Sequence, residues 1–218
     1  MDEPVPDVCT IGRCGVDLSP LEMNTPLEEV TRFGKFLGGS STNVAVAVAR
    51  LGHTAVAVTG VGDDPFGRFI RLELTRLGVD ASHVVVNPEF NTPVTFCEVF
   101  PPDSFPLFFY RQPTTPDLEI SAADLPDEVA SARILWLTVS GLAVEPSRSA
   151  HLEALRRRDG GLAVLDLDYR QRFWSSEDAA TEQIARILGQ VDVAIGNLEE
   201  CRIAVGETDP DAAALALL

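Results

Sequence analysis

The sequence is poor in positive charge. Its 218 residues include 17 Lys and Arg against 33 Asp and Glu, which gives a formal net charge of −16, and Lys35 is the only lysine. A protein that binds DNA or RNA needs a basic face to contact the phosphate backbone. The composition therefore excludes nucleic acid as the main partner. It does not exclude a small anionic substrate, which two or three well-placed arginines could bind.

Long apolar runs and the common cysteine and histidine motifs are also missing. The most apolar stretch, residues 44–62, is interrupted by Arg50 and His53, so we expect no transmembrane helix and no membrane partner. The acidic amino terminus lacks the apolar run of a signal peptide, which favours a cytoplasmic protein. The four cysteines form no CxxC pair and are expected to be reduced and buried. Scattered histidines and the lack of GxSxG argue against a zinc site and a serine hydrolase.

Most of the chain alternates between short apolar runs and segments with helical periodicity. The runs predict strands over residues 8–12, 33–37, 55–60, 134–138, 162–167 and 193–195. The intervening patterns predict helices over 40–51, 64–77, 146–157, 181–188 and 198–205, and a last helix from 209 that is cut off at Leu218. Residues 84–86, 93–100 and 107–110 instead predict strands joined by proline-rich turns, which is typical of a small antiparallel sheet.

Strands that alternate with helices predict an α/β fold in one domain. We expect a mostly parallel, doubly wound sheet with helices on both faces and the small sheet beside it. In such a sheet, ligands bind beyond the carboxyl ends of the strands. Polar and glycine-rich segments follow the predicted strands at 12–17, 60–64, 140–141, 168–170 and 196–197. This edge of the sheet is therefore expected to carry the chemistry.

The glycine pair Gly38-Gly39 stands directly before a predicted helix. Paired glycines let the backbone approach a ligand closely, and Asn43 in the first turn could bond to a hydroxyl. The local string alone favours a plainer explanation, a flexible turn followed by a helix that Ser40 or Ser41 caps.

Charged residues at other strand ends leave similar alternatives. Asp166 and Asp168 share one face of a strand, and the nearby Arg170 can pair with a carboxylate or a phosphate. A structural ion pair explains these residues as well as a binding role does. Taken alone, Arg111 is interpreted as an exposed surface arginine.

Two helix starts also allow two interpretations each. Asn197 and Glu200 fit either a glutamate in the favourable field of a helix amino terminus or a water-mediated Mg²⁺ site. The string Gly60-Val61-Gly62-Asp63 favours a tight turn with a capped helix over an anion site. Its spacing is not G-x-G-x-x-G, which counts against a dinucleotide-binding oxidoreductase.

Together, these motifs resemble those of the ribokinase-like (PfkB) family of sugar kinases. GGSSTNVAVAVARLG at 38–52 is similar to the family's first signature, GVGDDPFG at 60–67 to the loop that follows, and NLEE at 197–200 to its NxxE element. The resemblance runs over residues 8–218 and implies ATP-dependent phosphorylation of a sugar with Mg²⁺. Arginines near the sugar pocket further resemble kinases of sugar acids. The implied substrate is a keto-deoxy acid of myo-inositol breakdown, and 2-keto-3-deoxygluconate or another sugar is the alternative.

The resemblance also implies roles for single residues. It implies four residues that hold sugar hydroxyls: Asp17, Gly38, Gly39 and Asn43. It implies two arginines that face the substrate carboxylate: Arg111 and Arg170. Asn197 would approach the ATP phosphates, and Glu200 would organise Mg²⁺ through water. Strands within 13–38 and 90–112 would form a small β lid over the sugar, through which two copies could form a homodimer.

The family's catalytic aspartate lies in a later GxGD motif at the start of a helix, and the sequence stops before such a motif. Asp63 belongs to the early loop and is not that residue. We therefore expect the catalytic base beyond Leu218, in a longer kinase of which this chain is the amino-terminal part. The chain would also lack the carboxyl-terminal part of the fold and much of the nucleotide pocket, and would be inactive alone. A non-catalytic sugar-binding relative is the alternative.

Overall fold

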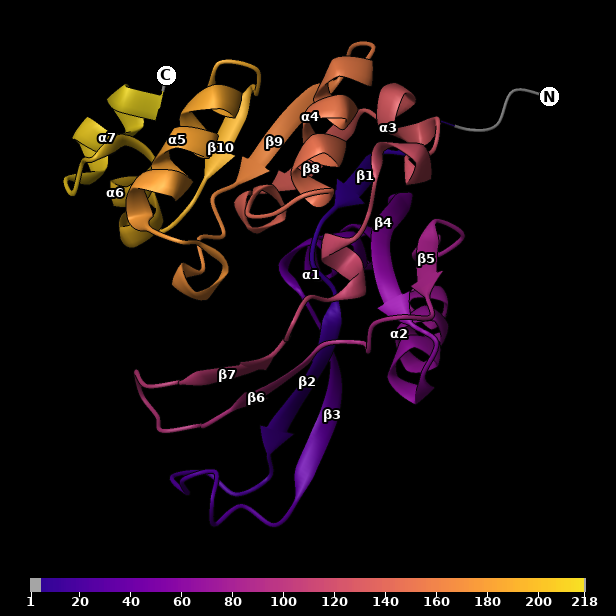
Figure 1. The fold of residues 1–218 in the computed structure, drawn as a ribbon, viewed down its shortest axis with the longest axis vertical. Coiled ribbons are helices and arrows are strands. Elements are labelled where there is room, and N and C mark those ends of the chain that lie inside the picture. Colours follow the sequence, from indigo (N-terminus) through magenta and orange to yellow (C-terminus); the bar gives the residue numbers. More distant parts are fainter. Residues whose placement is uncertain (1–4, 218) are drawn as a thin grey trace.

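A computed structural model describes residues 5–217 (Figure 1). Its larger sheet has six strands, and all neighbouring strands are parallel. In spatial order the strands are β10 (Val193–Ile195), β9 (Leu162–Asp166), β8 (Ile134–Thr138), β1 (Val8–Ile11), β4 (Ala55–Gly62) and β5 (Val84–Asn87). The predicted mostly parallel α/β fold is confirmed.

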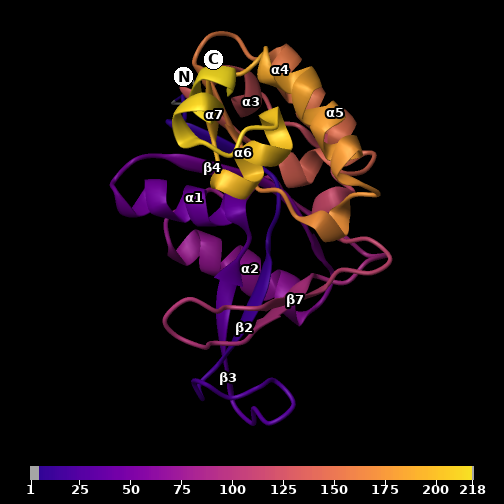
Figure 2. The same ribbon diagram turned by 90° about the vertical axis from the view of Figure 1, so that its left-hand side faces the viewer.

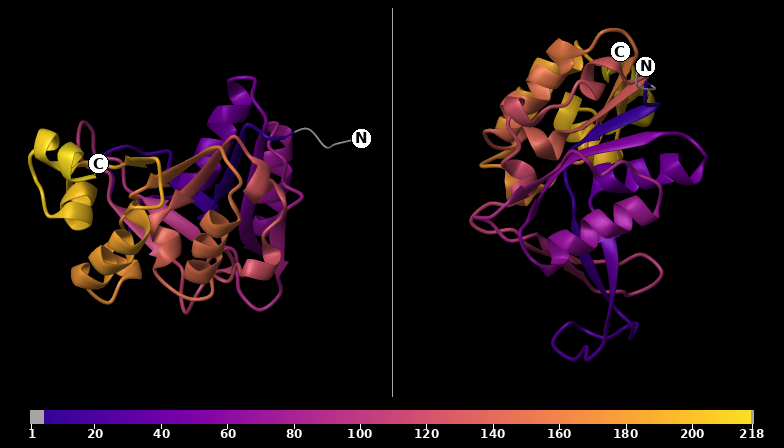
Figure 3. Two further views of the ribbon diagram at one scale, coloured as in Figure 1. Left: turned by 90° about the horizontal axis from the view of Figure 1, so that it is seen from above. Right: turned by 90° about the vertical axis from the view of Figure 1, so that its right-hand side faces the viewer.

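The larger sheet is wound in two directions from β1. The chain first passes from β1 to β4 and β5, then returns to β8 on the other side of β1 and continues to β9 and β10. Because parallel crossovers are right-handed, this reversal puts the connecting helices on opposite faces. Figure 3 shows α1 (Ser40–Arg50) and α2 (Pro65–Arg76) on one face and α4 (Ser147–Arg157) and α5 (Glu177–Leu188) on the other.

Shorter helical segments complete this layer arrangement. Before β8 lie η1 (Pro116–Leu118), η2 (Ala122–Asp124) and α3 (Glu128–Ser131), and η3 (Val139–Leu142) and η4 (Gln171–Phe173) follow β8 and β9. After β10 come α6 (Leu198–Val205), which packs against α5, and α7 (Pro210–Leu217). Within residues 5–217, no helix has the length and apolar character needed to cross a membrane.

Helix α7 is the predicted last helix, and it begins at Pro210, one residue after the predicted start. The predicted end of this helix at Leu218 lies outside the described residues, which stop at Leu217. The expectation of a catalytic base beyond Leu218 concerns a segment that the sequence does not contain. That expectation therefore stays a prediction.

A second sheet of four strands extends from the larger one (Figures 1 and 2). Its order is β3 (Phe33–Gly38), β2 (Gly15–Pro20), β6 (Val94–Cys97) and β7 (Leu107–Tyr110). Two parts of the prediction for this sheet are wrong. The run at 84–87 is β5 of the larger sheet, parallel to β4, and the small sheet is mixed because β2 and β6 are parallel. A short apolar run does not encode its partner strand, so pairing has to be decided by packing.

The starts of α1 and α2 show how far local chemistry predicts a helix end. The Asp64 carboxylate caps α2 as predicted, accepting hydrogen bonds from the backbone N–H groups of Phe66 and Gly67, both at 2.8 Å. The predicted serine cap of α1 is wrong, because its N-cap is Gly39 and no side chain caps it. The Ser40 and Ser41 hydroxyls instead bond to groups at the edge of the larger sheet.

The buried core lies on both faces of the larger sheet. One apolar cluster includes Leu135 and Leu165 with Ile184 of α5, and the other includes Ala57 and Val61 of β4 with residues of α1 and α2. Within the described residues all four cysteines are free thiols, as predicted, but only Cys9 and Cys14 are buried, and Cys97 and Cys201 are partly exposed.

Candidate functional site

Both sheets contribute to a cavity of about 210 Å³ at the carboxyl edge of the larger sheet. Its wall includes the link from β1 to β2, the start of α1, strands β6 and β7, and the segment after β9. Five of the six residues predicted to contact the sugar line it: Asp17, Gly39, Asn43, Arg111 and Arg170. The sixth, Gly38, lies against Asp17, because a Cβ atom at this glycine would be 2.3 Å from the Asp17 carboxylate.

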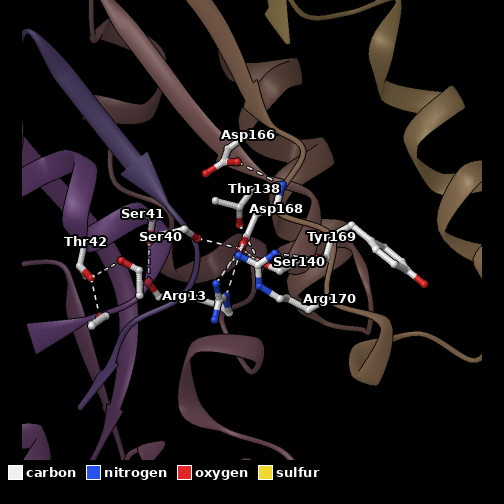
Figure 4. A network of polar contacts seen from close by, with 12 residues as sticks. Arg13, Ser40, Ser41, Thr42, Thr138, Ser140, Asp166, Asp168, Tyr169 and Arg170 are labelled. Atoms are coloured by element: carbon white, nitrogen blue, oxygen red, sulfur yellow. Dashed lines mark hydrogen bonds and ion pairs between the residues drawn. The ribbon is translucent and has the colours of Figure 1, made fainter. Parts of the chain in front are cut away.

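Asp168 is the centre of a buried polar network at this edge (Figure 4). Arg13 donates to it from Nε at 3.1 Å and from Nη2 at 2.9 Å, and Nη2 of Arg170 lies 2.7 Å from its Oδ1. The hydroxyls of Ser40 and Ser140 donate to Asp168 Oδ2 at 2.8 and 2.7 Å. One buried carboxylate therefore joins β1, α1, η3 and the end of β9.

Arg13 lines the cavity, although its sequence pattern did not mark it as a site residue. It follows β1, and its side chain is 9% exposed. Its guanidinium carbon lies 5.9 Å from the ring centre of Phe109 and 5.7 Å from that of Phe173. The signal for Arg13 was its position directly after a buried strand, at the edge where ligands bind.

Gly39 allows the start of α1 to approach the link between β1 and β2. Its φ is +106°, and a Cβ atom there would lie 2.3 Å from the backbone oxygen of Arg13. The Ser41 hydroxyl donates to this same oxygen at 2.8 Å. The glycine pair thus serves a close approach between two backbone segments, and Asn43, one turn further on, is exposed beside the cavity.

Arg111 is buried, which corrects its interpretation as an exposed surface arginine. It is 7% exposed and forms an ion pair with Asp117, which is 2% exposed. Among the described residues its Nε has no hydrogen-bond partner, and its guanidinium carbon lies 5.2 Å from the ring centre of Phe173. Sequence reasoning missed this burial because Asp117 belongs to a separate 3-10 turn.

Asp17 is the acidic residue of the cavity wall. Burial raises the pKa of its carboxyl group, while the charge of Arg13 and a hydrogen bond with Thr95 act in the opposite direction. A partly buried carboxylate on a cavity wall is suited to accept hydrogen bonds from substrate hydroxyls.

Asn197 and Glu200, which were predicted to contact the ATP phosphates and Mg²⁺, are connected to Arg170 through hydrogen bonds. Nη1 of Arg170 lies 3.0 Å from Oε1 of Glu200, which connects the Asp168 network to the start of α6. Asn197 and Glu200 cap α6 reciprocally: Asn197 Oδ1 accepts from the Glu200 N–H at 3.0 Å, and Glu200 Oε2 accepts from the Asn197 N–H at 2.9 Å. The structure thus gives this pair the role of a capping box.

Asp166 lies close to Asp168 at the same edge of the sheet (Figure 4). Burial, the neighbouring Asp168 carboxylate and the Glu200 carboxylate together raise its pKa to about 6. The backbone N–H of Asp168, which donates to Asp166 Oδ1 at 3.1 Å, opposes that rise. Asp166 can therefore gain or lose a proton near neutral pH.

Glu200 is the residue predicted to organise Mg²⁺. Each of its carboxylate oxygens already accepts a hydrogen bond and keeps a second lone pair. This arrangement fits a contact to metal-bound water better than direct coordination. Residues 5–217 contain no group of three or more His, Cys, Asp or Glu side chains arranged to hold a metal directly.

The string at 60–63 consists of the last three residues of β4 and Asp63, so the preferred interpretation as a tight turn with a capped helix needs one change. Strand β4 continues to Gly62, and the helix cap comes two residues later at Asp64. Gly60 is needed because a Cβ atom there would lie 2.1 Å from the backbone oxygen of Pro116 in η1. The sequence motif therefore reflects packing of η1 on β4.

The sequence pattern of the pfkB family of carbohydrate kinases matches residues 5–218. The chain belongs to this family. Among its relatives are the 5-dehydro-2-deoxygluconokinases of Shouchella clausii and Photobacterium profundum, which are 36% and 35% identical to it. These alignments cover 92% and 98% of this chain but 62% and 66% of the relatives, so the chain spans less than two thirds of their length.

Solved structures of a PfkB protein and of a fructokinase share the fold. A PfkB protein from Polaromonas sp. JS666 has a TM-score of 0.84 at 27% identity, over 97% of this chain and 72% of that one. A fructokinase variant from Vibrio cholerae O395, bound to fructose, ADP and potassium, has a TM-score of 0.83 at 27% identity, over 99% of this chain and 68% of that one. The family resemblance and the ribokinase-like fold are thus confirmed.

Proposed function

We propose that this pfkB protein, in its complete form, uses ATP to phosphorylate a sugar acid. The proposed substrate is 5-dehydro-2-deoxygluconate, an intermediate of myo-inositol breakdown. The observation that supports this proposal is the set of three arginines, Arg13, Arg111 and Arg170, around one cavity. The relatives named 5-dehydro-2-deoxygluconokinase support the same substrate.

Three guanidinium groups beside a small cavity favour an anionic ligand over a neutral one. Arginine presents a planar set of donors that matches a carboxylate, and such charge-assisted hydrogen bonds are stronger than neutral ones. A neutral sugar would leave some of these donors without an equally good partner. For this reason we favour a sugar acid over fructose, although a fructokinase shares the fold.

In the proposed mechanism, Asp17 and Asn43 bind substrate hydroxyls while Arg111 and Arg170 orient the carboxylate. The small sheet, acting as a lid, would exclude water so that the sugar hydroxyl rather than water receives the phosphoryl group. Asn197 would contact the ATP phosphates, and Glu200 would hold Mg²⁺ through water, an ion that neutralises phosphate charge. The catalytic base is proposed to lie beyond Leu218, in a GxGD segment that this chain does not contain.

The first experiment replaces Arg170 with alanine in the product of the gene's whole reading frame. ADP release is measured with 5-dehydro-2-deoxygluconate, 2-keto-3-deoxygluconate and fructose. We expect the variant to lose about 10- to 100-fold in kcat/KM for the sugar acid, the range for a hydrogen bond to a charged group, and much less for fructose. Arg133→Ala is the control, because Arg133 is exposed and pairs with Asp7.

Equal losses for the acid and for fructose would refute the carboxylate role of Arg170. A wild-type protein that prefers fructose would refute the proposed substrate class, and a preference for 2-keto-3-deoxygluconate would replace the proposed acid. The 218-residue chain is assayed in parallel and is expected to be inactive. If it binds the acid and the whole reading frame also shows no transfer, the protein is a non-catalytic sugar-binding relative.

We also propose that two copies pair through the small sheet. Strands β3 and β7 are the edges of this sheet, and Phe36, Leu107 and Tyr110 on them are exposed. Open strand edges with apolar side chains readily pair with another chain. Light scattering after size-exclusion chromatography should show a dimer that Phe36→Asp weakens, and a monomeric wild-type protein would contradict this proposal.

A further inference from the structure

The guanidinium of Arg13 is held from three sides. Asp168 accepts from its Nε and Nη2, which fixes the plane of the group. The rings of Phe109 and Phe173 lie within 6 Å of its central carbon, a distance typical of cation–π contact. These two rings also contact each other edge to face, with centres 6.0 Å apart. The position of the guanidinium is thus set before any ligand arrives.

The third nitrogen of this group, Nη1, makes no hydrogen bond within residues 5–217. Nε of Arg111 is a fully buried atom without a hydrogen-bond partner, but Nη1 of Arg13 is not fully buried. Part of the surface of Nη1 is therefore accessible to solvent or to a ligand. Because the side chain is 9% exposed and lines the cavity, we take this small open part to face the cavity. One oriented donor with positive charge is therefore available to a ligand there.

We propose that Arg13 is a substrate-binding residue that selects for the anionic group of the sugar acid. This inference rests on the proposed function and adds a residue to which the family resemblance assigned no role. In this proposal, the Nε and Nη2 atoms of the Arg13 guanidinium bind Asp168, and Nη1 donates to the substrate. Lysine could not replace it, because a single ammonium group lacks the rigid fork that binds two partners in fixed directions.

The charges around Asp168 are consistent with this role. Its single carboxylate is shared by Arg13 and Arg170, so it neutralises only part of their combined charge. A substrate anion would supply further negative charge at a position where the two guanidinium groups already converge. Removing Arg13 would leave Asp168 paired with Arg170 and with the Ser40 and Ser140 hydroxyls, so the fold should tolerate the change.

The test measures binding of 5-dehydro-2-deoxygluconate and of fructose to the product of the gene's whole reading frame by isothermal titration calorimetry. We expect Arg13→Gln to raise the Kd for the acid about 10- to 100-fold, the range for a lost charge-assisted hydrogen bond, and to change the Kd for fructose less than about threefold. Arg13→Lys should not restore acid binding. Arg158→Gln is the matched control, because it removes an arginine paired with Asp192 that lines no part of this cavity.

The outcomes separate this inference from the proposed function. A wild-type protein without preference for the acid contradicts the proposed function and the inference with it. A wild-type preference that survives in Arg13→Gln, or that Arg13→Lys restores in full, overturns the inference alone. If Arg13→Gln does not fold, Phe109→Leu provides the second test. It leaves every charge in place and removes a ring that makes a cation–π contact with Arg13, whereas the ring beside both Arg13 and Arg111, that of Phe173, stays. We expect it to weaken acid binding several-fold more than fructose binding, and an unchanged preference for the acid would overturn the inference.

Discussion

Replacing Asp168 with asparagine would test the central role of this buried carboxylate. The substitution keeps the size of the side chain and one carbonyl oxygen, but it removes the negative charge and introduces an N–H₂ group. Asp168 receives hydrogen bonds from Arg13, Ser40 and Ser140 and an ion pair from Arg170. The serine hydroxyls can reorient toward the new amide, but a guanidinium has no acceptor and cannot.

The expected loss follows mainly from Arg13. Its side chain is 9% exposed, whereas that of Arg170 is 33% exposed and keeps Glu200 as a partner. Removing one member of a buried ion pair typically costs about 3 to 5 kcal/mol, because the remaining charge stays buried and unpaired. We therefore expect Asp168→Asn to lower the free energy of unfolding by about 3 kcal/mol or more, a large part of the roughly 5 to 15 kcal/mol typical of a domain.

Urea unfolding followed by circular dichroism would measure this loss as a change in midpoint at constant slope. The double variant Arg13→Gln/Asp168→Asn should lose at least about 1 kcal/mol less than the sum of the two single losses, because the unpaired charge is gone. Glu177→Gln breaks an exposed pair with Arg202 and should leave the midpoint unchanged. A loss below about 1 kcal/mol for Asp168→Asn, or strict additivity in the double variant, would refute the reasoning.

Two further predictions concern Gly39 and Asp166. Gly39→Ala should destabilise the protein by at least about 2 kcal/mol more than Gly52→Ala in the same urea assay. Both glycines have positive φ, but only at Gly39 would the added Cβ atom meet backbone, 2.3 Å from the Arg13 oxygen. Similar losses for the two variants would disprove the close approach of these backbone segments. The raised pKa of Asp166, about 6 against an ordinary 3.8, means that between these values the folded form keeps a proton that the unfolded form has lost. The Asp166 carboxyl group therefore lowers the stability of the folded protein as pH rises from about 4 to about 6. The difference in unfolding free energy between Asp166→Asn and the wild type should shift in favour of the variant between pH 4 and pH 7. A difference that does not change with pH would contradict this prediction.

Much of the fold could be predicted because its signals are local. The alternation of apolar runs with helical periodicity indicated most strands and helices in the correct order, but it missed strand β2 and helix α3 and placed the start of α5 at residue 181 instead of Glu177. Asp64 with Pro65 marked the start of α2 as observed. Each of these signals extends over roughly ten residues and depends on backbone geometry and burial of one face. The positions of polar residues after the strands also indicated which edge of the sheet forms the cavity.

The errors share one physical cause, which is that a short segment does not encode its distant partner. Strand β5 belongs to the larger sheet because it pairs with β4. Its short sequence does not distinguish it from the strands of the small sheet that follow it in the chain. Ser40 is not a helix cap because Asp168, 128 residues away, accepts its hydrogen bond. Arg111 is buried because η1 packs against β4 and brings Asp117 to it.

By itself, then, the sequence determined the types and order of most elements, the acidic net charge and the edge at which polar side chains gather, since backbone conformation and burial patterns are local properties. Tertiary structure alone decided which strands pair and which charges meet. The ion pair of Arg13 and Asp168 joins residues 155 positions apart. Its formation depends on the right-handed crossovers that place β1 and β9 on either side of β8, so that their carboxyl ends lie at one edge.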